Sequence, residues 1–281
     1  MLIAQISDCH IRSGPSPFDR LVDSSETLKQ VVSHLLNNKV KPDVILATGD
    51  LTESGTDEEY VELLDLLSPL DFPILPIPGN HDEYSKFGDS LECYLPKELP
   101  DSHCSYVNDD FPIRLIGLDT SLPGRHDGDF DDERFEWLEE KLGSDSQKPT
   151  LLFTHFPPFA SGIHFMDISG LKNSERLCSL IEKNPQIKLV VSGHLHRPIA
   201  TMIGGSVASV CPSTSHQLGL ELNPEYGSLV NEPPGYQLHR WDGRRFTTHT
   251  AIVWEGKTLD LSSWISEVNQ QSSSGNGFPK K

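Results

Sequence analysis

Residues 74–82, Ile-Leu-Pro-Ile-Pro-Gly-Asn-His-Asp, place three side chains that can bind a metal directly after an apolar run. The run at residues 74–77 has the length and composition of a buried parallel strand. Gly79 permits a tight turn, and Asn80, His81 and Asp82 follow it without a gap. Four other segments repeat this order of apolar strand and polar cluster: residues 2–10 with Asp8 and His10, 44–50 with Asp50, 151–155 with His155, and 189–196 with His194 and His196. The pattern predicts an α/β fold with polar loops at the ends of parallel strands.

Loops at the carboxyl ends of parallel strands meet at one edge of a sheet, so these clusters are expected to form one site. That many ionisable groups are costly to bury without partners, and a pair of cations resolves the cost. Imidazole and carboxylate ligands together suit Mn, Fe or Zn. Each motif has a plainer interpretation when taken singly: Asp8-x-His10 is typical of a turn, and His155 could be a core histidine. Their joint occurrence, in order and each after a strand, favours a metal site.

Together, these motifs resemble the signature of the calcineurin-like metallophosphoesterases over roughly residues 1–255. The resemblance implies a four-layered α/β/β/α sandwich of two mixed sheets. It also implies two metal ions, of which Asp50 bridges both. The implied ligands of the first ion are Asp8, His10, Asp50 and His196, and those of the second are Asp50, Asn80, His155 and His194. Relatives often carry a second histidine after the ligand that matches His155, where this chain has Phe156.

Within that superfamily, the chain resembles the bacterial class III cyclic nucleotide phosphodiesterases and the similar glycerophosphodiesterases. This implies a metal-dependent phosphodiesterase that acts on a small phosphodiester, most readily a 3′,5′-cyclic nucleotide such as cAMP. The expected nucleophile is a hydroxide that bridges the two ions. Asn80, His81 and His216 are expected to bind the substrate, and His81 is also assigned a catalytic role, either stabilising the transition state or protonating the leaving oxygen. A structural histidine remains the alternative for His81, and a hairpin histidine for His216.

Other functions remain open at this stage. Besides a glycerophosphodiesterase or a diesterase of broad specificity, the scaffold suits a phosphomonoesterase or protein phosphatase, which would need arginines to hold a dianion. Arg12, Arg125 and Arg197 are the arginines near the motif loops. A non-catalytic binding module is disfavoured by the intact ligand set. An aromatic pocket for a nucleobase, or simply lid packing, is expected of four residues: Phe156, Phe159, His164 and Phe165.

Composition bears on location and partners. The net charge of −18 argues against binding to nucleic acid polymers and anionic membranes. No signal peptide or membrane span is recognisable, and five scattered cysteines suggest a reduced, cytoplasmic setting. The resemblance also implies a homodimer or higher homo-oligomer.

The expected layout is a single domain over residues 1–261, with a β-rich part at 200–255 and a disordered tail at 262–281. Apolar stripes predict helices around residues 28–36 and 60–67, the second behind a capping box from Thr56 to Glu59. Further helices are expected at 131–142 and 174–183. Residues 200–203, 207–210, 236–241 and 246–254 are expected to form antiparallel strands. Residues 217–235 are expected to form a long surface loop.

Overall fold

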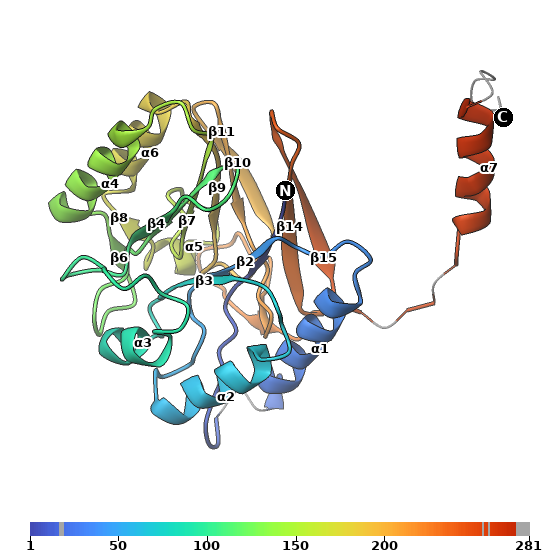
Figure 1. Ribbon diagram of the computed structural model, residues 1–281. Helices are drawn as coiled ribbons and strands as arrows, with labels where there is room; N and C mark the ends of the chain where they lie inside the picture. Colours follow the sequence, from blue (N-terminus) through green and yellow to red (C-terminus); the bar gives the residue numbers. More distant parts are fainter. Residues whose placement is uncertain (17–19, 255, 258, 274–281) are drawn as a thin grey trace.

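The computed structural model describes residues 1–16, 20–254, 256–257 and 259–273. Two mixed sheets lie face to face, with helices on both outer sides, as the resemblance implied (Figure 1). The first sheet has the order β15-β14-β1-β2-β3. Its strands are β1 (Leu2–Ile6), β2 (Val44–Thr48), β3 (Ile74–Ile77), β14 (Gly235–Trp241) and β15 (Phe246–Ile252). β1, β2 and β3 are parallel to one another, and β14 pairs antiparallel with β1.

The second sheet has the order β10-β11-β9-β7-β5-β4. Its strands are β4 (Tyr106–Asn108), β5 (Arg114–Leu118), β7 (Thr150–Thr154), β9 (Ile187–Ser192), β10 (Ile199–Ile203) and β11 (Ser206–Val210). The strands β5, β7, β9 and β11 are parallel. Two small pairs complete the strands: β6 (Gly128–Asp129) with β8 (Leu171–Lys172), and β12 (Gln217–Leu218) with β13 (Leu229–Val230).

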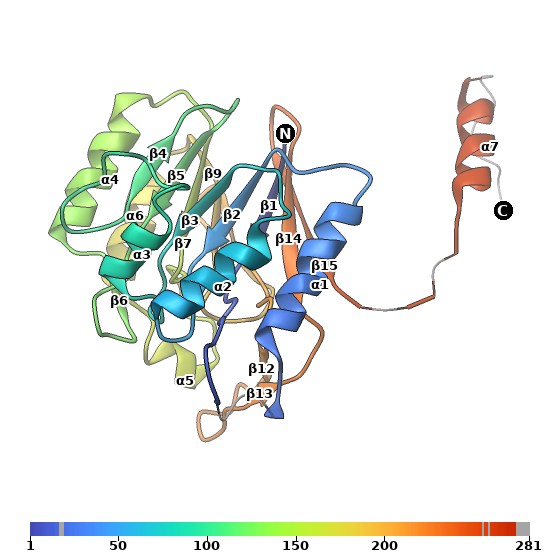
Figure 2. The ribbon, with the colours of Figure 1, turned by 60° about the horizontal axis from the view of Figure 1, so that its bottom comes forward.

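The helices form the two outer layers, as the turned view makes clear (Figure 2). The first sheet is covered by α1 (Ser24–Asn37), α2 (Asp57–Leu67) and α3 (Tyr84–Ser90), and the second by α4 (Asp132–Ser144) and α6 (Ser174–Lys183). The single turn α5 (His164–Asp167) lies between β7 and β8 in the sequence. Thr56 and Glu59 make the predicted capping box at the start of α2.

Side-chain alternation along the strands builds three apolar cores between the four layers. In β2, Val44 and Leu46 face the second sheet, whereas Ile45 and Ala47 pack under the first helical layer. A strand buried on both faces needs apolar residues throughout, which is why these strands appear as unbroken apolar runs. The predicted α/β/β/α sandwich is therefore confirmed.

Three expectations differ from the structure. β10 pairs antiparallel with β11, and β14 with β15, as expected, but β11 also pairs parallel with β9. Residues 217–235 are not wholly a surface loop, because Gln217 and Leu218 are buried and pair with β13. Within the expected tail, Ser262–Ser273 form a helix, α7, which lies apart from the sheets in Figure 1. A side-chain oxygen of Asp260 accepts hydrogen bonds from Ser262 at the start of α7, a local capping contact that favours a helix. Residues 274–281 lie outside the described residues.

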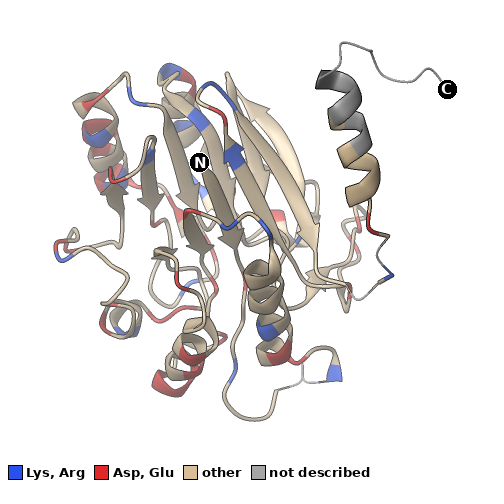
Figure 3. Cartoon of the chain, turned by 45° about the vertical axis from the view of Figure 1, so that its right-hand side comes forward, with Lys and Arg blue, Asp and Glu red and all other residues tan. Residues whose placement is uncertain are grey.

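Acidic and basic residues are carried mainly by the helices and loops (Figure 3). Helix α2 alone has five acidic residues on its short length: Asp57, Glu58, Glu59, Glu62 and Asp65. Among the described residues, no helix combines the length and apolar character needed to cross a bilayer.

Candidate metal centre

The polar clusters meet where the carboxyl ends of the parallel strands of the two sheets approach each other. Asp8, Asp50 and Asn80 follow strands of the first sheet, whereas His155 and His194 follow β7 and β9 of the second. The site is therefore shared by two sheets, not located at the edge of one as the sequence suggested. The His194 amide donates to a carboxylate oxygen of Asp8 at 3.0 Å and joins the two sheets directly.

The backbone at this site is strained. Among the described residues, six that are not glycine have a positive φ, and five of these belong to the site: Asp8 (54°), His10 (46°), Asp50 (49°), His194 (68°) and His196 (47°). Such conformations are costly for residues with a side chain and concentrate at functional sites. The surrounding strands hold the loops in shapes that aim these side chains inward.

Two glycines let the loops pack against the ligands. A Cβ atom added to Gly79 would lie 2.2 Å from Oδ1 of Asp50. One added to Gly193 would lie 2.0 Å from the Ser7 hydroxyl oxygen and 2.7 Å from Asp8. Because both distances are far below contact distance, any larger residue would push the Asp8 or Asp50 loop away.

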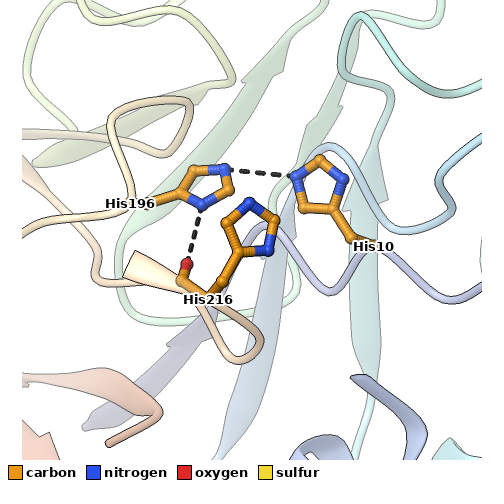
Figure 4. A group of neighbouring side chains, drawn as sticks. All are labelled: His10, His196 and His216. Atoms are coloured by element: carbon orange, nitrogen blue, oxygen red, sulfur yellow. Dashed lines mark hydrogen bonds between the residues drawn. The ribbon is translucent and has the colours of Figure 1, made fainter. Parts of the chain in front are cut away.

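The first candidate ligand group contains Asp8, His10, Asp50 and His196. One ligand atom from each lies within 4.8 Å of all the others, and all four side chains are buried. The His196 Nε2 atom is 3.3 Å from Asp8 Oδ1, and the His10 Nε2 atom is 3.8 Å from Asp50 Oδ2. Figure 4 shows the rings of His10 and His196 with that of His216 beside them.

The second candidate group contains Asp50, His155 and His194, whose ligand atoms also lie within 4.8 Å of one another. The Asn80 side-chain oxygen adjoins it, 3.2 Å from the His155 Nε2 atom. That nitrogen is 3.4 Å from Asp50 Oδ2. Asp50 therefore belongs to both groups, and the structure brings together each set of four side chains that the resemblance implied.

The imidazole tautomers provide a test of whether these groups fit a metal. The His10 Nδ1 atom donates to the Glu53 carboxylate at 2.7 Å, and the His196 Nδ1 atom donates to the His216 carbonyl oxygen at 2.8 Å (Figure 4). The Nε2 atoms of both rings face each other at 3.1 Å. In the neutral rings both Nε2 atoms carry lone pairs. A cation satisfies both lone pairs at once, so this arrangement fits a metal ion.

The second group passes the same test. The His155 Nδ1 atom donates to the Thr48 carbonyl oxygen at 2.9 Å, which leaves Nε2 to face the Asn80 and Asp50 oxygens. The buried His194 Nε2 atom has no hydrogen-bond partner among the described residues. Because an unsatisfied buried nitrogen is costly, a cation at this position removes the penalty.

The imidazoles of the two groups differ in how readily they bind a proton. Burial lowers the pKa of His155, but the Asp50 carboxylate outweighs it and raises that pKa to about 9. Burial, with a smaller effect of His155, lowers the pKa of His194 to about 3. Burial also lowers the pKa of His10. The imidazoles thus cannot all charge together, whereas metal ions bind to the neutral rings.

Two neighbouring carboxylates organise the loops. Glu53 follows Asp50 by three residues, but no role was predicted for it. Its carboxylate accepts a hydrogen bond from His10, and its carbonyl oxygen accepts one from the His81 Nδ1 atom at 2.9 Å. Asp82 accepts from the amides of Leu51, Thr52 and Gly79, and from the Thr52 hydroxyl, so it ties the Asp50 loop to the Asn80 loop. Burial and the nearby Asp50 raise the pKa of Asp82 to about 6.

Replacing Glu53 tests its contact with His10. Glu53→Gln should weaken metal binding by about 10- to 100-fold, because the histidine loses the charged acceptor that holds its ring. Competition with a chromogenic chelator measures this affinity directly. Glu58→Gln makes the same chemical change on an exposed position of α2 and should leave the affinity unchanged. Equal affinities for Glu53→Gln and the unaltered protein would remove Glu53 from the site.

A cavity of about 260 Å³ opens over the two groups. The lining includes members of both groups together with His81, His126 and His216. The ring of His81 lies edge-on to His10, with centroids 4.8 Å apart, and the His216 ring lies 4.7 Å from His196. Burial lowers the pKa of His81, but Asp50 and Glu53 outweigh it and raise that pKa above its ordinary value. His81 and His216 thus both line the cavity, and their roles toward a substrate stay predictions.

Of the four aromatic residues considered for a pocket, one lines the cavity. Phe165 does so from α5. Phe156 is fully buried, with its ring centroid 5.0 Å from His155 and 4.5 Å from His194, so it supports the ligands from below. Phe159 packs against the core under α4 and α6, and His164 is exposed at the start of α5.

Comparisons with known proteins agree with this geometry. A relative from Arcobacter nitrofigilis, named "Probable glycerophosphodiester phosphodiesterase GpdQ", is 39% identical over 256 residues, which are 90% of this chain and 93% of that protein. A Synechococcus protein named as a probable cyclic nucleotide phosphodiesterase is 33% identical, over 83% of this chain and 88% of its own. The crystal structure of a dimetal phosphatase from Danio rerio shares the fold, with a TM-score of 0.65 at 14% identity, covering 90% of this chain and 96% of that one. The family model for calcineurin-like phosphoesterases matches residues 1–198. This chain therefore belongs to the calcineurin-like phosphoesterase family.

Proposed function

We propose that this protein is a dinuclear metal-dependent phosphodiesterase that hydrolyses small phosphodiesters, with 3′,5′-cyclic nucleotides such as cAMP as its preferred substrates. The observation that carries the proposal is the pair of ligand groups that share Asp50 beneath one cavity. The cavity volume of about 260 Å³ suits a small ligand better than a polymer.

The first ion would be held by Asp8, His10, Asp50 and His196, and the second by Asp50, Asn80, His155 and His194. Mn, Fe and Zn are the ions that suit this mixture of imidazole and oxygen ligands. When bound, such a pair supplies hydroxide from water near neutral pH and neutralises charge on the phosphoryl oxygens.

The histidines that line the cavity handle the substrate. His81 uses its Nδ1 atom to bond the Glu53 carbonyl oxygen, which leaves Nε2 available to the cavity. From there it is placed to donate a proton to the leaving oxygen or to stabilise charge on the phosphate. His216 contributes a second imidazole beside His10 and His196.

A diester substrate is favoured over a monoester by the charge of the cavity lining. Among the described residues around the cavity, none is Lys or Arg. The three arginines near the motif loops are engaged elsewhere: Arg12 with the Val22 carbonyl oxygen, Arg125 with Asp127, and Arg197 with Glu232. A monoester dianion would therefore meet no Lys or Arg side chain in the cavity lining, whereas a diester carries a single negative charge.

A glycerophosphodiester is the second candidate substrate, because a relative at 39% identity carries that name. The decisive assay measures turnover of cAMP, glycerophosphoethanolamine, bis(p-nitrophenyl) phosphate and p-nitrophenyl phosphate by the metal-loaded protein. Preference for p-nitrophenyl phosphate would replace the proposal with a phosphomonoesterase. No turnover of any of the four would leave a binding module.

Removal of metal should lower both activity and stability. Chelation is expected to abolish diester hydrolysis and to lower the melting temperature by about 10 °C, since ions that bind only the folded chain stabilise it by mass action. Differential scanning calorimetry before and after chelation measures the shift. Restoring Mn, Fe or Zn should recover both properties, and elemental analysis should then find two ions per chain. Less than one ion per chain would contradict the dinuclear proposal.

The homodimer or higher homo-oligomer and the cytoplasmic location stay predictions from the sequence. Light scattering of the purified protein measures the first, and cell fractionation the second.

A further inference from the structure

The cavity lining contains two chemically different sets of residues. One set is the candidate ligands and the histidines beside them. The other set is four apolar residues, here called the apolar wall: Phe165 and Met166 from α5, Leu218 from β12 and Leu229 from β13. His126 and Ser169 also line the cavity. Neither metal binding nor attack on a phosphate uses an apolar surface, so the apolar wall needs another explanation.

Local contacts fix the apolar wall in place. Leu218 and Leu229 are direct partners in the β12–β13 pairing, so the two side chains are neighbours. Arg197 donates to the Leu218 carbonyl oxygen and also pairs with Glu232 at 3.0 Å, which anchors β12. On the other part of the wall, the Asp167 carboxylate accepts from the Ser161 amide at 2.8 Å and secures the turn of α5.

The two parts of the wall also touch each other. A Cβ atom added to Gly227 would lie 2.8 Å from the Phe165 ring, so the loop between β12 and β13 packs its backbone against that ring. Phe165 nevertheless keeps 38% of its surface exposed, and Leu229 is half-buried. The wall is thus a preformed apolar surface that still has area to bury against a ligand.

We propose that the apolar wall binds an aromatic or other apolar group on one arm of the phosphodiester, and so selects a nucleobase-bearing substrate over one with only polar arms. This proposal rests on the proposed function, because it gives a role to the apolar residues of the same cavity. Apolar surface gains free energy when it leaves water against an apolar partner, whereas a glycerol arm gains little there and loses hydrogen bonds to water. Specificity would then come from residues that belong to none of the metal-binding motifs.

The test uses two substrates with the same reacting ring: cAMP, and methyl riboside 3′,5′-cyclic phosphate, which lacks the base. The variants are Phe165→Ala and Leu229→Ala, and the matched control is Leu220→Ala, a leucine on the same β12–β13 loop that is 68% exposed and does not line the cavity. For each protein, kcat/KM is measured on both compounds in the metal-loaded state. A compound that is not cleaved is measured as a competitive inhibitor of bis(p-nitrophenyl) phosphate hydrolysis, with its inhibition constant in place of kcat/KM.

The unaltered protein should favour cAMP over the base-free compound by about ten- to a hundredfold, the range expected for burying a large apolar group. Each wall variant should lose about tenfold or more on cAMP and less than about twofold on the base-free compound, while Leu220→Ala changes neither. Equal losses on both compounds, or no preference in the unaltered protein, would overturn the assignment of the wall. Failure of the unaltered protein to hydrolyse bis(p-nitrophenyl) phosphate would instead overturn the proposed function. Melting temperatures of the variants identify any loss that comes from unfolding.

Discussion

Asp50→Asn is expected to empty both metal positions and to cause the largest loss of turnover of any single substitution at the site. Asp50 is the residue that belongs to both ligand groups, and its Oδ2 atom lies 3.8 Å from the His10 Nε2 atom and 3.4 Å from that of His155. The loss should exceed the roughly 10- to 100-fold cost of removing a residue that only orients a ligand. Elemental analysis after reconstitution measures the metal content, and hydrolysis of bis(p-nitrophenyl) phosphate measures the turnover.

Asn is chosen because its side-chain oxygen can still accept the His81 amide, which donates to Asp50 Oδ1 at 2.8 Å. Asp8→Asn and His155→Ala are the controls, since each belongs to one group and should empty one position. Retention of two ions by Asp50→Asn would show that Asp50 does not bridge. Loss of both ions in all three variants would instead mean that the two positions fill only together.

His81→Ala should leave the metal content intact and slow the reaction strongly. Its Nδ1 atom is bonded to the Glu53 carbonyl oxygen, so the side chain is held by the backbone and presents its other nitrogen to the cavity. General acid catalysis contributes about 10²- to 10⁴-fold, and its benefit rises as the leaving group becomes poorer. The loss should therefore be large for cAMP, whose leaving alkoxide needs a proton, and smaller for bis(p-nitrophenyl) phosphate.

His164→Ala serves as the control because His164 is exposed at the start of α5 and does not line the cavity. An equal loss on both substrates would assign His81 to stabilisation of phosphate charge. Loss of metal in His81→Ala would make it a ligand or a support for one.

Much of this protein can be predicted from its sequence because the signals are local. Buried parallel strands need apolar runs, and the five predicted ones coincide with β1, β2, β3, β7 and β9. Helix caps are also local, and the capping box of Thr56 and Glu59 starts α2 as expected. The order of the polar clusters identified the residues that the structure gathers into two groups around Asp50.

The remaining features depend on contacts between distant segments. β11 pairs parallel with β9, and the sequence pattern of β11 does not indicate which strand it will lie beside. Glu53 resembles any loop carboxylate until folding brings His10 to 2.7 Å from it. Phe156 and Phe165 are both aromatic residues in the segment after β7. Phe156 is fully buried next to the candidate ligands, whereas Phe165 lines the cavity.

The sequence by itself determined the α/β class, the five buried parallel strands and the polar clusters that follow them, because each follows from residue type and spacing along a single segment. The tertiary structure alone decided that the ligands come from two sheets, that five of the site residues hold a positive φ, and that the apolar wall lines the same cavity as the ligands. Those features arise when segments far apart in the chain pack together, because contacts across the whole fold offset the cost of the strained backbone.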